Sequence, residues 1–209
     1  MTAHDEPREN PGKREPHSHH EDLPAAARVR RLEERLIAAG LATDEEIDEL
    51  LTRFYADAAP VNGARIVARA WSDQEFRGRV LADASAAVAE LGLGPQLRGY
   101  QLRAVANTPD RHNVIVCTLC SCYPLSLLGP SPAWYRSLAY RSRAVREPRA
   151  VLAEFGLTLP GSTSIDVWDS TSEIRYLVIP IRPAGTDGLD QEALAGLVTR
   201  NGLIGTAAV

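Results

Sequence analysis

Apolar residues near the start of the chain recur at the three-to-four-residue spacing of an amphipathic helix. The first such stripe ends before Gly40, a residue typical of helix ends, and the second follows the capping-box pair Thr43 and Glu46 and stops at Pro60. So small a unit could not bury both stripes, and we expect a helical arm that packs on a partner or back on the domain. The stripes are Val29, Leu32 and Leu36, and Ile47, Leu50, Leu51 and Phe54.

Further helices and then strands are predicted after Pro60. The helices cover residues 62–71, 72–92, 134–138, 148–155 and 190–199, where the second begins with the Ser72 and Glu75 box. Strands are predicted at 101–105, 114–116, 164–168 and 174–179. This order predicts an α+β fold, with a mostly antiparallel sheet and helices outside it.

The composition along the chain predicts three parts. Residues 1–23 combine prolines, charges of both signs and four histidines with almost no core-forming residue, which favours a disordered tail. We interpret these four histidines as part of a solvated spacer. The helical arm then covers residues 24–60, and the globular, metal-binding domain covers residues 61–209.

Length and charge limit the class of protein. The 209 residues suffice for one domain with a proper core. A net charge of -4 gives no basic field, so nucleic acid is not an expected partner. The sequence contains neither a secretory signal nor an apolar run long enough to span a membrane, and we expect a cytoplasmic protein without a membrane partner.

All three cysteines fall within six residues, at Cys117, Cys120 and Cys122. Their odd number excludes a disulfide framework. Several interpretations remain: a zinc or iron-sulfur site with His112 as fourth ligand, a thioredoxin-type redox pair, or an inert buried trio. Four-ligand sites lack a fourth cysteine, the redox motif lacks its helix, and three adjacent thiols without a purpose would invite oxidation.

The remaining interpretation uses the backbone. Sulfurs at Cys120 and Cys122 bring a bound ion close to the amide nitrogens of Ser121 and Cys122. Two deprotonated amides and two sulfurs in one plane suit a trivalent, low-spin ion, with Cys117 as axial ligand. The position opposite Cys117 then stays open, which is typical of a catalytic metal site. We call residues 117–122 the cysteine claw.

The sequence Val-Cys-Thr-Leu-Cys-Ser-Cys at 116–122 resembles the metal-binding motif of the nitrile hydratase alpha subunit. The similarity covers roughly residues 28–207 and includes Arg-Glu-Pro-Arg at 146–149. It implies a layered α-β-β-α domain of that family's type and the hydration of a nitrile to its amide. Arg141 and Arg143 match the family's subunit contacts near the claw, whereas Arg146 and Arg149 suit a solvated or salt-bridged helix face.

The resemblance also implies the chemistry of the site. Cys117, Cys120, Ser121 and Cys122 hold the metal, and Cys120, Ser121 and Cys122 are the catalytic set. In the family the cysteine matching Cys120 becomes a sulfinic acid and that matching Cys122 a sulfenic acid. Threonine at position 118 goes with Co(III), whereas serine would go with Fe(III). The partner is a β-type subunit, on one chain or split over two, whose arginines hold the sulfur oxygens.

Three positions depart from the family pattern and concern the substrate pocket. Leu125 stands where typical members have a tryptophan. The position of a pocket glutamine falls on Arg98, with Gln96 two residues before it, and Ala106 replaces a frequent acidic residue. A missing indole opens space, so we expect a nitrile larger than usual, such as the nucleoside nitrile toyocamycin.

Two other functions fit the same residues. The gamma subunit of thiocyanate hydrolase shares the claw, the metal and the cysteine oxidation, but acts on thiocyanate. A non-catalytic metal-binding or redox-sensing protein could also be built on three clustered thiols.

Overall fold

The computed structural model describes residues 24–93 and 99–209, with only the backbone of Ala25 and residues 54–57. The chain divides into two units, one ending at Leu51 and the other beginning at Thr52. The predicted tail, residues 1–23, and the predicted pocket residues Gln96 and Arg98 lie outside the described residues.

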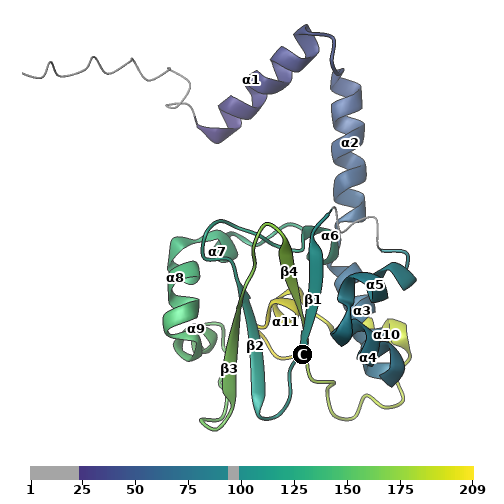
Figure 1. Cartoon of the computed structure of the whole chain (residues 1–209), viewed down its shortest axis with the longest axis vertical. Helices are drawn as coiled ribbons and strands as arrows, with labels where there is room; N and C mark the ends of the chain where they lie inside the picture. Colours follow the sequence, from purple (N-terminus) through teal and green to yellow (C-terminus); the bar gives the residue numbers. More distant parts are fainter. Residues whose placement is uncertain (1–23, 94–98) are drawn as a thin grey trace, which may run out of the picture. The chain divides into compact units, whose positions relative to one another are not determined.

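The first unit contains helix α1, Ala25–Ala38, and most of helix α2, Asp44–Asp57 (Figure 1). Both helices were predicted. The capping box is confirmed, because the Thr43 hydroxyl oxygen accepts from the Glu46 amide at 3.1 Å and the Glu46 carboxylate accepts from the Thr43 amide at 2.9 Å. Val29, Leu32 and Leu50 are all more than half exposed, so the predicted apolar stripes face outward.

The second unit contains four strands in two parallel pairs. Strand β1, Gln101–Ala106, pairs with β4, Ile174–Ile179, and β2, Arg111–Val116, pairs with β3, Ser164–Asp169. The expected antiparallel sheet is therefore wrong. Residues 107–110 make a short turn between β1 and β2 that could have closed a hairpin, but the paired strands are each joined by long connections containing helices.

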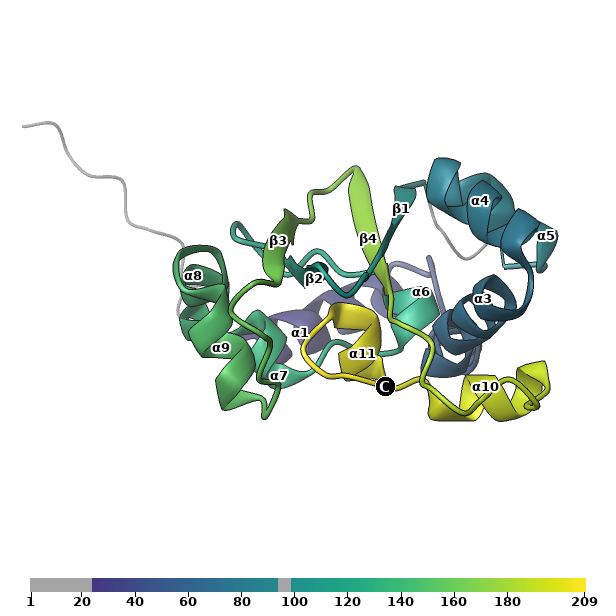
Figure 2. The ribbon, with the colours of Figure 1, turned by 90° about the horizontal axis from the view of Figure 1, so that it is seen from below.

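Helices cover both sides of these strands, which confirms the α+β class (Figures 1 and 2). On the β1 side lie α3, Pro60–Ser72, α4, Gln74–Ala82, α5, Ala84–Glu90, and α10, Gln191–Leu197. On the β3 side lie α8, Leu138–Arg146, and α9, Pro148–Glu154. Short helices α6, Leu125–Leu128, α7, Ala133–Arg136, and α11, Arg200–Ile204, complete the unit. Among the described residues, no helix is long and apolar enough to cross a membrane.

The single helix predicted over residues 72–92 is two helices. Asp73 caps α4 by accepting from the Phe76 amide at 2.9 Å, and Asp83 caps α5 by accepting from the Ala86 amide at 3.0 Å. Asp83 is extended, with φ of -146°, so the chain turns between the helices. Ser72, the predicted cap, instead donates its hydroxyl to the carbonyl of Ala68.

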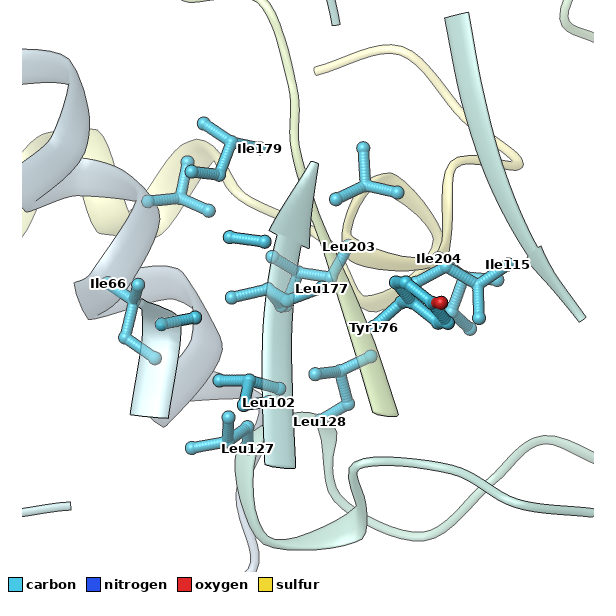
Figure 3. Packing of buried hydrophobic residues seen from close by; sticks show 14 of the residues in the cluster. Ile66, Leu102, Ile115, Leu127, Leu128, Tyr176, Leu177, Ile179, Leu203 and Ile204 are labelled. Atoms are coloured by element: carbon cyan, nitrogen blue, oxygen red, sulfur yellow. The ribbon is translucent and has the colours of Figure 1, made fainter. Parts of the chain in front are cut away.

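Apolar side chains from β1, β2 and β4 and from helices α3, α6 and α11 meet in one core (Figure 3). Ile66, Leu102, Ile115, Leu177 and Leu203 are each at most 1% exposed. In the β2 and β3 pair, Val116 lies in register with Asp169, so both strands end together. The rigid core therefore delivers two parallel strand ends to the same edge, where the cysteine claw begins.

Candidate metal centre

The cysteine claw follows directly after β2 and brings three sulfurs together. The Sγ atoms of Cys117 and Cys120 lie 3.5 Å apart, and those of Cys120 and Cys122 lie 3.2 Å apart. All three are free thiols within 4.8 Å of one another. Cys117 is buried, Cys122 is half-buried and Cys120 is exposed, so the cluster extends from the protein interior to the solvent.

These distances can be compared with the sulfur spacing in two kinds of metal site. Two sulfurs each about 2.3 Å from one ion lie about 3.3 Å apart at right angles, and about 3.8 Å apart at a tetrahedral angle. The 3.2 Å between Cys120 and Cys122 matches the right-angled arrangement, whereas the 3.5 Å between Cys117 and Cys120 lies midway between the two. The spacing of Cys120 and Cys122 therefore suits neighbouring ligands of a square or octahedral ion with soft ligands.

Backbone amides also face the sulfurs. Hydrogen bonds from Cys122 and Cys117 lower the pKa of the Cys120 thiol to about 7, with smaller contributions from the backbone N–H groups of Ser121 and Cys122. Burial and then the hydrogen bond to Cys120 raise the pKa of Cys122 to about 12. The first thiolate therefore forms at Cys120, and the two amides predicted as metal ligands already lie against its sulfur.

Two charged side chains fix the backbone of the claw. Arg141 on α8 donates Nε to the carbonyl of Cys117 at 3.0 Å and Nη2 to that of Thr118 at 2.8 Å. On the other side, the carboxylate of Asp169 accepts from the backbone N–H and the hydroxyl of Thr118, at 2.9 and 2.5 Å. Charge-assisted hydrogen bonds of this kind set the path of the turn before any metal binds.

A buried aromatic cluster supports the claw from below. Tyr135 is fully buried and donates its hydroxyl to the carbonyl of Cys122 at 2.9 Å. Its ring meets those of Tyr123 and Trp134 edge-on, at centroid distances of 5.0 and 6.0 Å. Burial raises the pKa of the Tyr135 hydroxyl, so it remains a donor at neutral pH.

Comparison with known proteins now decides the family. The model of the family described as nitrile hydratase, alpha chain, matches residues 23–207. This chain belongs to the nitrile hydratase alpha-chain family. Enzymes of the family convert a nitrile to the corresponding amide.

Individual relatives agree with this assignment. The chain is 50% identical over 180 residues to the cobalt-containing nitrile hydratase subunit alpha of Pseudonocardia thermophila, covering 86% of this chain and 88% of that one. It is 47% identical over 158 residues to thiocyanate hydrolase subunit gamma of Thiobacillus thioparus, covering 71% and 65%. Its fold matches a double mutant of the Fe-type nitrile hydratase from Comamonas testosteroni Ni1, with a TM-score of 0.82, 40% identity and coverage of 88% and 89%.

His112 does not join the cluster, in contrast to the alternative of a four-ligand zinc or iron-sulfur site. Its Nε2 lies 2.7 Å from the Gly205 carbonyl, and its Nδ1 lies 3.2 Å from the Asn107 amide nitrogen. Both ring nitrogens are thus engaged at the opposite end of β2. Among the described residues, the potential metal cluster contains only the three cysteines.

Sequence reasoning about this nitrile hydratase family member missed Asp169 and Tyr135. Neither residue belongs to a motif. The one available signal is that Asp169 is a polar residue at the end of a strand, and this could have identified it. Arg141 lies at the claw, although the subunit contact expected of it stays a prediction. Arg143 forms ion pairs with Glu147 at 2.7 Å and Glu154 at 2.5 Å. Arg149 donates to three backbone carbonyls rather than lying free on a helix face.

Of the predicted pocket residues, Leu125 lies just past the claw at the start of α6 and is half-buried. The next residue, Ser126, is buried, and its hydroxyl lies 3.0 Å from that of Tyr100. The Tyr100 ring in turn lies under the guanidinium of Arg175, with 5.2 Å between Cζ and the ring centroid. Tyr100 and Arg175 are side chains near the claw that sequence reasoning did not single out.

Proposed function

We propose that this chain is the metal-binding alpha subunit of a cobalt nitrile hydratase, acting in the cytoplasm with a β-type partner. The proposed ligands are Cys117, Cys120, Cys122 and the backbone nitrogens of Ser121 and Cys122. As implied by the family, Cys120 becomes a sulfinic acid and Cys122 a sulfenic acid. The free thiols fit a reducing compartment.

One observation carries this proposal. Sulfurs 3.2 and 3.5 Å apart, with the amides of Ser121 and Cys122 facing Cys120, form a donor set of soft sulfurs and backbone nitrogens that suits a trivalent ion. When bound, such an ion supplies Lewis-acid polarisation for attack on the nitrile. Threonine at position 118 and the cobalt-containing relatives favour cobalt over iron.

The chain's own residues prepare this site. Cys117 is 1% exposed and fixes the inner end of the claw, whereas Ser121 and Cys120 are exposed and face the approaching substrate. Arg141 and Asp169 hold the turn from two sides, so the donor atoms are in place before loading. Preorganisation of this kind lowers the cost of placing ligands around the ion and the substrate beside it.

The surface beside the claw supports a partner subunit. Leu119 is 87% exposed, Leu138 77% and Val145 50%, an unusual group of bare apolar side chains. Leu138 and Val145 line an open groove of about 390 Å³ together with Thr118, Arg141, Ser142 and Arg146. A β-type subunit seated here would cover these side chains and enclose the substrate, whether it is one chain or two.

Leu125 supports a substrate larger than a small aliphatic nitrile, of the toyocamycin type. A half-buried leucine beside the claw fills less space than the indole usual in the family. The proposed substrate is therefore a neutral nitrile attached to a bulky, polar ring system, whose C≡N reaches the claw while the ring rests near Leu125.

The test is co-expression with a β-type partner in medium containing cobalt. We expect about one cobalt per chain, amide formation from a heteroaromatic nitrile, and a tryptic peptide spanning residues 117–122 that carries three added oxygen atoms. A complex without cobalt, or an active complex with an unmodified claw, would contradict the proposal. Metal binding without turnover of any substrate would instead support the non-catalytic alternative.

A second function is supported by the 47% identity to thiocyanate hydrolase subunit gamma. The same purified complex separates the two functions. Carbonyl sulfide released from thiocyanate, with slower amide formation from nitriles, would assign the chain to thiocyanate hydrolysis.

A further inference from the structure

Arg175 is a cation that has no counter-charge within the part of the chain that the structure describes. It lies on β4 in register with Leu102 and is half-buried. Among the described residues, no carboxylate forms an ion pair with it, and its Nε is buried without a hydrogen-bond partner. The only hydrogen bond of its side chain there runs from Nη1 to the carbonyl of Ile174, at a long 3.3 Å. Unpaired buried cations are costly, so an acceptor from elsewhere is expected.

The guanidinium is held in place by stacking. It lies over the Tyr100 ring, and the Tyr100 hydroxyl is 3.0 Å from the hydroxyl of Ser126. The carbonyl of Ser126 accepts from the side-chain amide of Asn62 at 3.0 Å. Stacking occupies a face of the guanidinium and leaves the terminal Nη donors on its edge for a ligand, whereas Nε is buried.

The position of Arg175 relates it to the substrate. Tyr100, beneath the guanidinium, has its hydroxyl 3.0 Å from that of Ser126, which directly follows Leu125. The cation is therefore connected through Tyr100 to the segment just after the claw, next to the position where the family's usual tryptophan is missing.

We propose that Arg175, held over Tyr100, is a specificity-determining residue that binds an anionic or hydrogen-bond-accepting group on the substrate beside its C≡N bond. This inference rests on the proposed function and deepens it, because it names the polar feature of the substrate. Two classes of substrate combine a C≡N bond with a neighbouring hydrogen-bond acceptor. One is a nitrile that carries an oxygen or ring-nitrogen acceptor, and the other is thiocyanate, which is itself an anion. A guanidinium presents two parallel donors to such a group, which an ammonium cannot.

The experiment compares two substrates with the same skeleton in the cobalt-loaded complex. Cyanoacetate carries a carboxylate where isovaleronitrile carries an isopropyl group. We expect Arg175→Met to lower the ratio of kcat/KM for cyanoacetate to that for isovaleronitrile at least about tenfold, mainly through KM. The same ratio for Arg175→Lys should lie between the ratios for Arg175→Met and the wild type. Arg103→Met is the matched control, since Arg103 is an exposed arginine on the neighbouring strand, and it should leave the ratio unchanged.

Thiocyanate provides the second arm. Calorimetry on the complex prepared without cobalt should show that Arg175→Met weakens thiocyanate binding at least about tenfold. With cobalt, turnover of thiocyanate by the wild type identifies thiocyanate as the ligand, whereas competitive inhibition alone identifies an acceptor-bearing nitrile. If the wild type turns over none of the three compounds, the proposed function fails while the calorimetric test of Arg175 still stands.

Two outcomes would overturn the role of Arg175. One is a substrate ratio and a thiocyanate affinity that Arg175→Met changes less than about twofold. The other is weaker assembly with the β-type partner, seen by size-exclusion chromatography, at an unchanged substrate ratio. That second result would make Arg175 an interface residue that pairs with a carboxylate of the partner.

Discussion

The carboxylate of Asp169 receives two hydrogen bonds from Thr118, one from the backbone N–H at 2.9 Å and one from the hydroxyl at 2.5 Å. The last residue of β3 thus fixes the second residue of the claw. We expect Asp169→Asn to lose at least one of these bonds, since an amide has a single acceptor oxygen. Stability should fall by about 1 kcal/mol and cobalt content by more than half, measured by denaturant unfolding and by elemental analysis of the purified complex.

Asp166→Asn is the control for this substitution. Asp166 lies on the same strand, and its 3.4 Å ion pair with Arg111 is exposed. Its loss should change stability and cobalt content little. Equal loss of cobalt in both variants would show that Asp169 acts on the strand as a whole and not on the claw.

Arg141 carries the second prediction. Arg141→Met keeps much of the side-chain stem but removes the donors to the carbonyls of Cys117 and Thr118. We expect at least a tenfold loss of kcat, with reduced cobalt loading, because the donor atoms of the claw lose their fixed positions. Arg136→Met, at an exposed arginine on the adjacent helix, should stay near the wild-type values. Full cobalt content and activity in Arg141→Met would refute the positioning role.

Two buried tyrosines offer a matched pair for the third prediction. Tyr135 donates to the carbonyl of Cys122 at 2.9 Å, and Tyr140 donates to that of Ile115 at 2.6 Å. Replacing either by phenylalanine leaves a carbonyl unpaired, and each should cost about 1–2 kcal/mol of unfolding free energy. Only Tyr135→Phe should also reduce cobalt binding, measured as the cobalt retained after dialysis against a chelator. Similar cobalt retention in both variants would limit Tyr135 to a role in folding.

Local signals in the sequence predicted much of this molecule. The capping box at Thr43 and Glu46 and the strand at residues 174–179 depend on neighbours a few residues apart, and both are present. The predicted cysteines are together for the same reason, since six consecutive residues can hardly separate.

Features that depend on distant residues were not predictable in this way. Strand direction was wrong because it depends on how the long connection from β2 to β3 crosses the sheet, and no turn residue encodes that path. Asp169 reaches Thr118 across 51 positions, and Arg175 reaches Tyr100 across a strand pair. One local failure, the helix break at Asp83, arose because a capping aspartate inside an apolar stripe was read as an ordinary helix residue.

His112 gives the last prediction, which concerns pH. Its Nε2–H donates to the Gly205 carbonyl, because that oxygen can only accept, and its bare Nδ1 accepts from the Asn107 amide. A proton on Nδ1 would face the N–H of Asn107. Burial lowers the pKa of His112, and the Gly205 carbonyl opposes this only in part. Gly205 itself has φ of 90°, and a Cβ there would lie 1.9 Å from the Asn113 carbonyl oxygen, so this turn requires glycine.

Because the folded pKa lies below the unfolded value of about 6.5, protonation favours the unfolded chain. The contribution of His112 to stability should therefore be constant above about pH 6.5 and fall as the pH drops below it, by at most about 1.4 kcal/mol per pH unit. Denaturant unfolding at pH 7.5, 6.5 and 5.5 measures this, in a range where carboxylates titrate little. His112→Gln should have a lower free energy of unfolding at pH 7.5, and this energy should change less between pH 7.5 and pH 5.5 than in the wild type. The variant keeps the four other histidines. A wild type that is equally stable at pH 7.5 and 5.5 would show that His112 is not held neutral by this network.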